Sequence, residues 1–438
     1  MIDRILLEKI SDFNFWSKDQ ETGIYRKELK EVLNFVDDKN FTLIIAGIRR
    51  AGKTFLSRQI LKTKIEKGVK PEQTLYINFE DPVLEPYLNI DGLNNFYQSY
   101  RYFLNKEKFA YIVLDEIQNV PKWEKWVRIM MEKKENVKFI LTGSSSKFYK
   151  ENQARILTGR ALTYFLFPLS FSDFLKFKNY PLKKFQSFLK IQPYIAEYLE
   201  FGGFPLIVLE KNREKKQIYL KELFNDILIK DIIIKYKLRE LDAKKLAFIL
   251  VNQFSALVSI RRLKNLLEEI VGERTSPTSI NRYLEYFSNS FIFFFVPIFS
   301  YKIKETFRYP KKVYVIDTGL INSLSLRFSE NIGRLYENLV AKTLWEKYGL
   351  ENIFYWKDHS KELDFVVKQG LEVFQLIQVC SEIKKKKIFK REISALLKAS
   401  QELKCNNLLV ITKNYQGKEK FKNKTIKFIP LWKWLLYN

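Results

Sequence analysis

The sequence has almost no cysteine or histidine, and this scarcity excludes several classes of site. Among 438 residues there are two cysteines, Cys380 and Cys405, and one histidine, His359. Two cysteines cannot build a disulfide framework and are typical of a reducing cytosol. One histidine, with no cysteine pair at metal-binding spacing, excludes a zinc site or a histidine-based catalytic triad. We therefore interpret His359, within Lys357–Ser360, as a loop residue.

The sequence also lacks targeting signals and long apolar runs. Its first residues, Met-Ile-Asp-Arg-Ile-Leu-Leu-Glu, carry acids and lack the basic start and apolar run of a signal peptide. The most apolar stretch, Phe291–Phe299, is interrupted by Pro297 and is too short to cross a bilayer. No internal repeat or low-complexity linker separates its parts. We expect a cytoplasmic protein that has no membrane partner and whose domains pack closely.

Positive charge is what the sequence has in excess. The formal net charge is +26. The hydrophobic content of 46% and the aromatic content of 16% suffice for folded cores, and the length suits two to four domains. Such a surplus attracts polyanions, of which nucleic acid is the commonest inside cells. Basic residues cluster at Lys384–Lys387, Lys390-Arg391 and Lys418–Lys427. We expect DNA to bind through basic surfaces; the alternative is a general lysine bias that gives solvated surfaces.

Buried strands alternate with helix-length polar segments in the first part of the chain. The apolar runs are Phe41–Ala46, Leu75–Phe79, Tyr111–Leu114, Val137–Leu141 and Ala161–Phe167. Continuous apolar runs suit strands that are covered on both faces, and their alternation with helices is typical of a doubly wound parallel sheet. The sequence therefore predicts an α/β fold here.

A phosphate-binding loop follows the first of these strands. Gly47-Ile-Arg-Arg-Ala-Gly-Lys-Thr54 matches the Walker A pattern, in which backbone N–H groups and a helix N-terminus surround phosphates. Lys53 is expected to neutralise the β- and γ-phosphates, and Thr54 to hold Mg²⁺ through its hydroxyl. The pattern predicts ATP and Mg²⁺ as cofactors. The predicted nucleotide-binding residues are Gly47, Ile48, Arg49, Arg50, Ala51, Gly52, Lys53, Thr54 and Phe55.

A Walker B strand, Tyr111–Glu116, completes the predicted site about sixty residues later. Asp115, at the end of the strand, is expected to order the Mg²⁺ shell. Glu116, the next residue, is expected to orient and polarise the attacking water. An acid directly after the Walker B aspartate indicates an enzyme that supplies its own catalytic base.

Further catalytic candidates lie at the ends of later segments. Thr142 or Ser144, after the strand that ends at Leu141, is a candidate sensor of the γ-phosphate, although an ordinary strand-ending turn accounts for them nearly as well. Arg155 and Arg160 are candidate arginine fingers that would act on the nucleotide of a neighbouring subunit in a homo-oligomer. A surface or structural role for these arginines stays open, and so does the oligomeric state.

The middle of the chain follows a different pattern. Residues 170–242 have helical periodicity and form a predicted lid or linker. Residues 243–328 contain predicted helices at 243–256, 260–271 and 279–288 and strands at 291–298 and 312–316, which describe a winged helix. Its third helix would offer Asn281 and Arg282 to DNA, and the alternative is a packing or lid module. Further basic residues nearby, suited to phosphate contacts, are Arg261, Arg262, Lys264 and Arg274.

Several stretches together resemble one known family, the prokaryotic and especially archaeal AAA+ ATPases with a C-terminal DUF4143 domain. Besides the Walker motifs, the matching stretches are Ile77–Glu80, Trp123-Glu124, Leu141–Ser145, Leu157–Arg160, Phe167–Phe171, Gly202–Pro205, Val315–Gly319 and Gly333–Asn338. The resemblance implies an AAA+ core (1–169, with an N-terminal helical extension), a helical lid (170–242), a winged helix (243–328) and a nuclease-like α/β domain (329–438).

The C-terminal domain resembles PD-(D/E)XK nucleases, also called restriction-endonuclease-like, but departs from them at a central position. Glu337 and Asp364 suit that layout, in which carboxylates hold Mg²⁺ and a lysine positions the attacking water. The expected Glu-x-Lys reads Gln378-Val379-Cys380 in this chain. Weak metal binding by Glu337 and Asp364, with Lys384 as a substitute lysine, stays open. We expect a fold kept for DNA docking or for structure and no nuclease activity.

The sequence thus favours a Mg²⁺-dependent AAA+ ATPase coupled to DNA binding. One alternative is an ATP-regulated signalling or defence switch that acts on a protein partner. Another is an ATP-coupled DNA nuclease.

Overall fold

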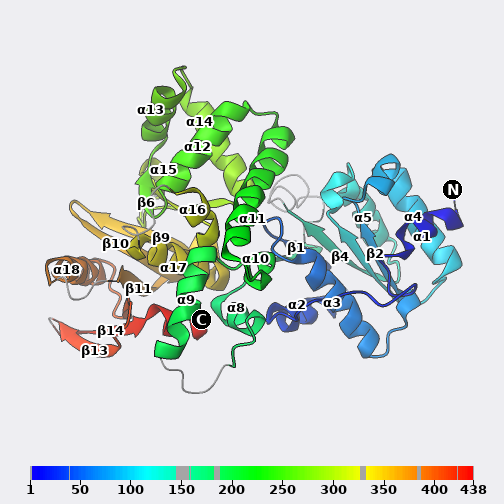
Figure 1. Ribbon diagram of the computed structural model, residues 1–438, viewed down its shortest axis with the longest axis horizontal. Helices are drawn as coiled ribbons and strands as arrows, with labels where there is room; N and C mark the ends of the chain where they lie inside the picture. The colour runs from blue at the N-terminus through cyan, green and yellow to red at the C-terminus, as the bar shows by residue number, and fades with distance from the viewer. Residues whose placement is uncertain are drawn as a thin grey trace. The chain divides into compact units, whose positions relative to one another are not determined.

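The computed structural model describes residues 2–437 except 39, 145–156, 158, 182–187, 326–331, 382–385 and 422. The chain divides into two compact units, Met1–Leu166 and Phe167–Asn438, and Figure 1 labels most of their elements. Arg155 and Lys384, which the sequence singles out, lie outside the described residues. In the part of the chain that the structure describes, no helix is long and apolar enough to cross a membrane.

The first unit is built on a parallel sheet. Its strands are β1 (Thr42–Ala46), β2 (Thr74–Asn78), β3 (Ala110–Asp115), β4 (Val137–Gly143) and β5 (Ala161–Phe165), in the spatial order β2-β3-β4-β1-β5. Every neighbouring pair is parallel, so the predicted parallel sheet is confirmed. Since β4 lies between β1 and β3, the ends of three strands that carry predicted site residues lie side by side.

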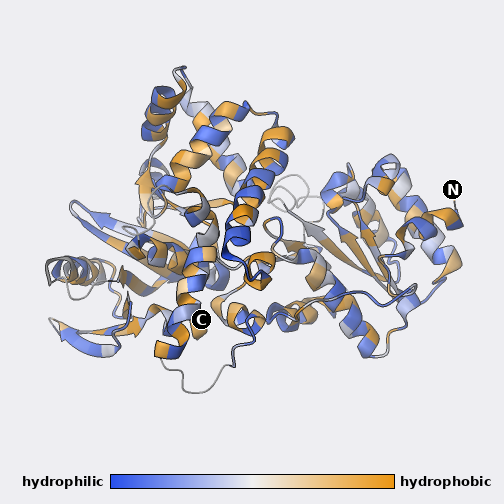
Figure 2. Cartoon of the chain, viewed as in Figure 1, coloured by the Kyte–Doolittle hydropathy of each residue, from blue (hydrophilic) through white to orange (hydrophobic). Residues whose placement is uncertain are grey.

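Helices cover both faces of this sheet. They are α1 (Arg4–Ser11), α2 (Glu28–Val36), α3 (Lys53–Glu66), α4 (Ile90–Phe103) and α5 (Trp123–Glu132). On one face, α2 and α3 bury Val32 and Ile60 against strand residues such as Ile45. On the other, Trp126 of α5 packs edge-on against Phe139 of β4 and Tyr97 of α4. The mostly apolar strands in Figure 2 are consistent with burial on both sides.

The second unit begins with a run of helices and continues with two sheets. The longer helices are α8 (Phe171–Phe177), α9 (Phe188–Phe201), α11 (Arg213–Asp226), α12 (Glu240–Asn252), α13 (Ile260–Val271), α14 (Pro277–Asn289), α16 (Thr318–Leu324), α17 (Ile332–Tyr348) and α18 (Lys386–Glu402). The shorter ones are α10 (Pro205–Leu209), α15 (Ile303–Arg308) and α19 (Leu431–Leu436). A π-helical segment, Ile227–Ile234, follows α11.

The first of the two sheets lies in the middle segment. It has the order β6-β8-β7, with strands β6 (Ala256–Val258), β7 (Phe293–Val296) and β8 (Lys311–Val315), all antiparallel. The predicted helix 243–256 is too long at its end, because α12 stops at Asn252 and β6 follows. Ser255 adopts a positive φ of 53° between them, and a strand of three residues is too short to give a periodic signal.

The second sheet lies in the C-terminal segment. Its order is β13-β14-β12-β11-β10-β9, with strands β9 (Ile353–Asp358), β10 (Lys361–Gln369), β11 (Glu372–Cys380), β12 (Leu408–Thr412), β13 (Gly417–Phe421) and β14 (Lys424–Pro430). Strands β9, β10 and β11 are antiparallel, whereas β11, β12 and β14 are parallel. Helix α18 buries Ile393 and Leu396 against this sheet, and α17 packs on β10 and β11. The result is the mixed α/β arrangement expected for this part of the chain.

Candidate functional site

Close backbone packing holds the loop between β1 and α3 in place. A Cβ on Gly47 would lie 2.2 Å from the carbonyl oxygen of Leu166, so only glycine fits there. Gly52 caps α3 with a φ of 102°, a conformation that L side chains rarely adopt. Ile48 and Ala51 are buried and anchor the loop. Their packing leaves the loop wrapped around the N-terminus of α3, where a bound anion is favoured.

Lys53, the first residue of α3, turns its ammonium back into this loop. Its Nζ donates to the carbonyl oxygens of Gly47 (3.2 Å) and Ile48 (3.4 Å). The same Nζ lies 3.2 Å from Oε1 of Glu116, and both side chains are almost fully buried. The predicted phosphate-neutralising lysine and the predicted base are therefore direct neighbours.

Asp115, at the end of β3, is the centre of a hydroxyl cluster. Its Oδ2 accepts from Thr54 Oγ1 (2.7 Å) and from the Tyr76 hydroxyl (2.5 Å), and its Oδ1 accepts from Thr142 Oγ1. Burial, and then the charge of Glu116, raise the pKa of Asp115 against the lowering effect of these hydrogen bonds. Tyr76 was not predicted from the sequence, because a tyrosine in a buried strand looks like any other core residue until its neighbours are known.

Glu116 occupies a strained position directly after β3. Its backbone lies in the left-handed region (φ 51°), and its N–H donates to Thr142 Oγ1 at 3.0 Å. Gln118 Nε2 donates to one of its carboxylate oxygens. Burial opposes ionisation, but the nearby Lys53 charge and the bond from Gln118 hold the pKa of Glu116 below its usual value. A carboxylate kept ionised in a buried, strained position is a typical feature of a functional site.

The two sensor candidates differ in what they contact. Thr142, the next-to-last residue of β4, bonds both the Asp115 carboxylate and the Glu116 backbone. Ser144 lies one residue beyond the strand and is buried. The strand order explains why Thr142 lies next to Asp115, since β4 lies between the strand before the Walker A loop and the Walker B strand. Thr142 is the candidate that this geometry brings into the site.

Further polar residues surround the loop. Arg49 forms an ion pair with Glu80 at 3.0 Å, and burial and the Glu116 charge raise the pKa of Glu80. Arg50 takes a positive φ of 62° within the loop. Arg26 was missed: it pairs with Glu28 at 2.9 Å and donates to the Ala51 carbonyl at 2.7 Å, so the N-terminal extension braces the loop.

Two other singled-out residues lie away from this cluster. Arg160 precedes β5, its carbonyl accepts from the N–H of Thr42 at the start of β1, and its guanidinium pairs with Glu132 at 2.9 Å. The start of β1 lies at the opposite end of the strand from the loop, so Arg160 is not part of its own chain's site. The arginine-finger role stays a prediction. His359 lies in the turn between β9 and β10 with its side chain 95% exposed.

Phe55 lies at the outer side of the loop. This residue is 41% exposed. Gly23, with a φ of 60°, passes close to its ring, since a Cβ there would lie 3.1 Å from Phe55. The N-terminal extension therefore runs directly along the first turn of α3, next to the predicted nucleotide-binding residues.

The predicted DNA-contacting residues lie on α13 and α14 and in the loop between them. Arg261, Arg262, Arg274, Asn281 and Arg282 are all exposed. Lys264 is half-buried and pairs with Glu268 one turn later at 2.9 Å. Ser276 caps α14 by accepting from the Ser279 N–H. Of the six basic or polar candidates, five therefore present their side chains to solvent.

The donor set at the end of β3 fits a magnesium ion. A carboxylate and a threonine hydroxyl, the ligands that Mg²⁺ takes beside nucleotide phosphates, lie 2.7 Å apart at the mouth of an anion-binding loop. An ionised Glu116 lies next to them and next to the lysine. Such an arrangement can bind a metal-complexed triphosphate and activate water beside it.

Comparison with protein families divides the chain into three matched segments. Residues 39–175 match the AAA domain, residues 192–331 match a domain of unknown function (DUF8612), and residues 332–434 match DUF4143. Among solved structures, similarity is found to the Walker-type ATPase PABY2304 of Pyrococcus abyssi, with 15% identity, a TM-score of 0.46 and coverage of 69% and 96% of the two chains. The Aeropyrum pernix ORC1 protein in complex with DNA gives 14% identity, a TM-score of 0.34 and coverage of 69% and 93%.

Full-length relatives are found among curated proteins. The "Uncharacterized protein MJ1544" of Methanocaldococcus jannaschii is 39% identical over 90% of this chain and 88% of its own length. An "Uncharacterized protein" of Haemophilus influenzae is 29% identical over 81% of this chain and 86% of its own length. With its parallel sheet and P-loop, the chain belongs to the family of archaeal-type AAA+ ATPases with a C-terminal DUF4143 domain.

Proposed function

We propose that this protein is a Mg²⁺-dependent ATPase that hydrolyses ATP to ADP and phosphate and couples this cycle to DNA binding. The observation that carries the proposal is the buried contact between Lys53 and Glu116, with Thr142 bonded to the backbone of Glu116. A base for water and a cation for phosphate are held together at the N-terminus of a helix. A pocket that only binds nucleotide needs no base in this position.

The residues have distinct tasks in the proposed reaction. The loop N–H groups and Lys53 bind the β- and γ-phosphates, and Thr54 and Asp115 hold Mg²⁺, which neutralises phosphate charge when bound. Glu116 accepts a proton from the water that attacks the γ-phosphorus, and the bond to the β–γ bridging oxygen breaks. Thr142 accepts from the backbone N–H of Glu116 and donates to the Asp115 carboxylate, so that it positions the Glu116 backbone and the Asp115 side chain.

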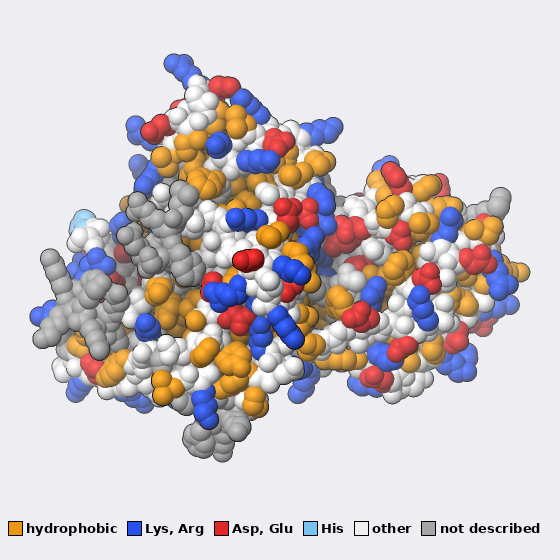
Figure 3. All heavy atoms as spheres, viewed as in Figure 1, with side chains coloured by type: hydrophobic (Ala, Val, Ile, Leu, Met, Phe, Trp, Pro, Cys, Tyr) orange, Lys and Arg blue, Asp and Glu red, His pale blue; other side chains and the backbone are white. Residues whose placement is uncertain are grey.

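The proposed DNA contact uses the middle segment as a winged helix. The order α12, β6, α13, α14, β7, α15, β8 has three longer helices, the short helix α15 between β7 and β8, and a three-stranded antiparallel sheet. In such modules the helix equivalent to α14 enters the major groove. Figure 3 shows Lys and Arg side chains, with some acidic ones among them, over the part of the unit that carries α12, α13 and α14. The basic groups there suit phosphate contacts, and the net charge of +26 supports a polyanionic partner.

The proposal is tested by measuring ATPase rates with and without double-stranded DNA at two salt concentrations. We expect turnover that requires Mg²⁺, a change of rate on adding DNA at low salt, and loss of that change at high salt. Lys53→Ala supplies the background. No turnover above this background would contradict the ATPase, whereas turnover indifferent to DNA at both salt concentrations would contradict only the coupling and favour a protein partner.

A further inference from the structure

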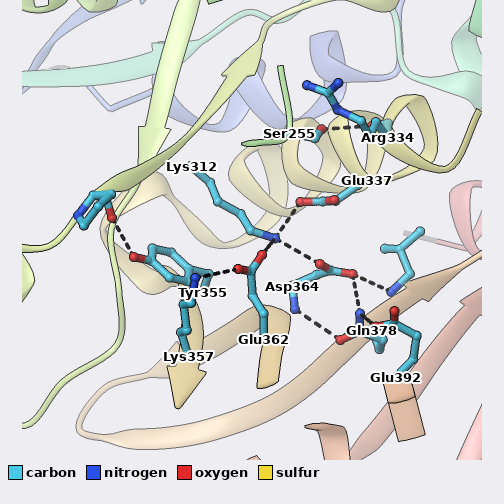
Figure 4. A network of polar contacts seen from close by, with 12 residues as sticks. Ser255, Lys312, Arg334, Glu337, Tyr355, Lys357, Glu362, Asp364, Gln378 and Glu392 are labelled. Atoms are coloured by element: carbon cyan, nitrogen blue, oxygen red, sulfur yellow. Dashed lines mark hydrogen bonds and ion pairs between the residues drawn. The ribbon is translucent and has the colours of Figure 1, made fainter. Parts of the chain in front are cut away.

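A buried lysine occupies the middle of the carboxylate cluster of the C-terminal domain. The ammonium of Lys312 lies 2.9 Å from Glu337, 2.9 Å from Glu362 and 3.0 Å from Asp364. The Lys312 side chain is 2% exposed. Figure 4 shows it extended from β8 with the three carboxyl groups directed at its tip. The structure thus brings together the two acids singled out in the sequence, but around a lysine that the sequence did not single out.

The four residues come from separate elements. Lys312 belongs to β8, Glu337 to α17, and Glu362 and Asp364 to one face of β10, two residues apart. Tyr314, two residues after Lys312 on the same face of β8, donates its hydroxyl to Glu337 at 2.7 Å. The middle sheet thus contributes both the cation and a hydroxyl donor to a site whose acids belong to the C-terminal segment.

The geometry matches an ammonium ion in the place of a metal ion. Lysine has three N–H donors, and three carboxylate oxygens lie at hydrogen-bond distance around its nitrogen. Oxygens that hold Mg²⁺ lie about 2.0–2.1 Å from the ion. The longer distances around Lys312 are those of an ammonium group. Three acids this close repel one another strongly without a positive charge among them. Lys312 supplies that charge from the chain itself.

Gln378, which stands where the nuclease pattern has a glutamate, is a second residue that suits a site without metal. Its Nε2 donates to Asp364 Oδ2 at 2.9 Å and to Glu392 Oε2 at 2.5 Å, and its Oε1 accepts from the Asp364 N–H at 3.2 Å. The Val379 N–H also donates to Asp364 Oδ2 at 2.9 Å. A glutamate at position 378 would place a further negative charge between Asp364 and Glu392. The neutral amide instead fills the second oxygen of Asp364 with protein donors.

We propose that Lys312 is an internal cation that replaces a divalent metal ion in this carboxylate site. The site is therefore a suppressed Mg²⁺ or Mn²⁺ site, which reappears when the ammonium is removed. The wild-type chain binds no divalent ion there and cleaves no DNA with it. This inference is independent of the ATPase proposed for the first unit.

The test is Mn²⁺ binding by Lys312→Met, followed by electron paramagnetic resonance and by thermal unfolding in EDTA and in Mn²⁺. We expect Lys312→Met to be less stable than wild type in EDTA, to bind one more Mn²⁺ per chain, and to gain roughly 5 °C in Tm with Mn²⁺ near 100 times its Kd. Adding Asp364→Asn to this variant should abolish the extra binding. Lys342→Met is the matched control, because Lys342 is also buried but pairs with the single carboxylate of Glu346 at 3.2 Å.

Two results would overturn the proposal. One is a Lys312→Met variant that takes up no more Mn²⁺ than Lys342→Met, or one that unfolds in EDTA and does not refold in Mn²⁺. The other is wild-type binding of Mn²⁺, or cleavage of DNA with it, that Asp364→Asn removes. The second measurement needs no stable Lys312 variant.

Discussion

In the predicted ATP site, the orientation of a single side chain depends on neighbours from outside the Walker motifs. Asp115 accepts hydrogen bonds from three hydroxyl groups, and Tyr76 is the one of these that belongs to neither Walker motif nor to β4. Such supporting bonds fix the rotamer and the charge of a metal ligand. The Tyr76 hydroxyl, raised in pKa by burial and then by the Asp115 charge, stays protonated and remains a donor.

We therefore predict that Tyr76→Phe weakens Mg²⁺ binding. The Mg²⁺ concentration that gives the half-maximal rate of ATP turnover should rise on the order of tenfold. The measurement is a Mg²⁺ titration at saturating ATP. Tyr100→Phe is the control, since Tyr100 is equally buried and donates to the Glu72 carbonyl at 2.8 Å, away from the site. An unchanged Mg²⁺ titration for Tyr76→Phe would show that Asp115 needs no such support.

A second residue, Asp317, tests whether burial outweighs hydrogen bonding. Its carboxylate accepts from the N–H groups of Gly203 (2.7 Å) and Gly319 (2.9 Å), yet burial raises its pKa to about 6. A raised folded-state pKa means that the stabilising contribution is complete below the unfolded value, 3.8, and is lost as pH rises through about 6.

The expected result concerns the stability of wild type relative to Asp317→Asn. This difference should fall by up to about 3 kcal/mol between pH 4 and pH 7, measured by urea unfolding, because two pKa units correspond to nearly this free energy. A difference that instead grows with pH would mean that the two N–H donors, and not burial, set the pKa.

Whole elements show what the sequence could and could not predict. The strands of the first unit were found because continuous apolar runs bounded by polar segments are typical of strands buried on both faces, and the Walker residues followed from their positions at strand ends. Strand order is not written in such runs, so the placement of Thr142 next to Asp115 needed the structure. Lys312 was missed for a related reason: it lies in a different segment from its acids, 25 and 52 residues away from two of them.

The stretches Gly202–Pro205 and Val315–Gly319 illustrate the same point, since their pairing is visible only in three dimensions. Gly202 adopts a φ of 73°, and a Cβ there would lie 1.6 Å from Asp317 Oδ1. Asn338, from the third such stretch, accepts from the Val315 N–H at 2.9 Å and donates to the Val315 carbonyl at 2.8 Å. These stretches therefore hold α9, β8, α16 and α17 together and have a structural role.

Gly202→Ala is predicted to destabilise the protein by at least about 2 kcal/mol more than Gly272→Ala. Both glycines have a similar positive φ, but a Cβ on Gly272 would meet no atom within 4 Å. The pair thus separates the clash with Asp317 from the cost of the backbone conformation. Equal losses in thermal or urea unfolding would contradict the proposed contact.

At the scale of the whole molecule, the net charge of +26 supports the proposed polyanionic partner. The proposed DNA contact through α14 predicts that Arg282→Ala weakens binding about equally for different sequences and lowers the slope of log K against log salt by about 1. Arg213→Ala removes the same charge from α11, where Arg213 pairs with Glu200. Fluorescence anisotropy at several salt concentrations compares the two, and equal effects would mean that only net charge matters.

The account depends most on Glu116 as the base for water. The decisive measurement is the fate of ATP bound to Glu116→Gln in a single turnover, because the amide keeps the shape of the side chain and cannot accept the proton. We predict that this variant retains ATP and Mg²⁺ while hydrolysis falls at least about a hundredfold, in contrast to Lys53→Ala, which loses nucleotide binding. Hydrolysis by Glu116→Gln at the wild-type rate would contradict the assignment.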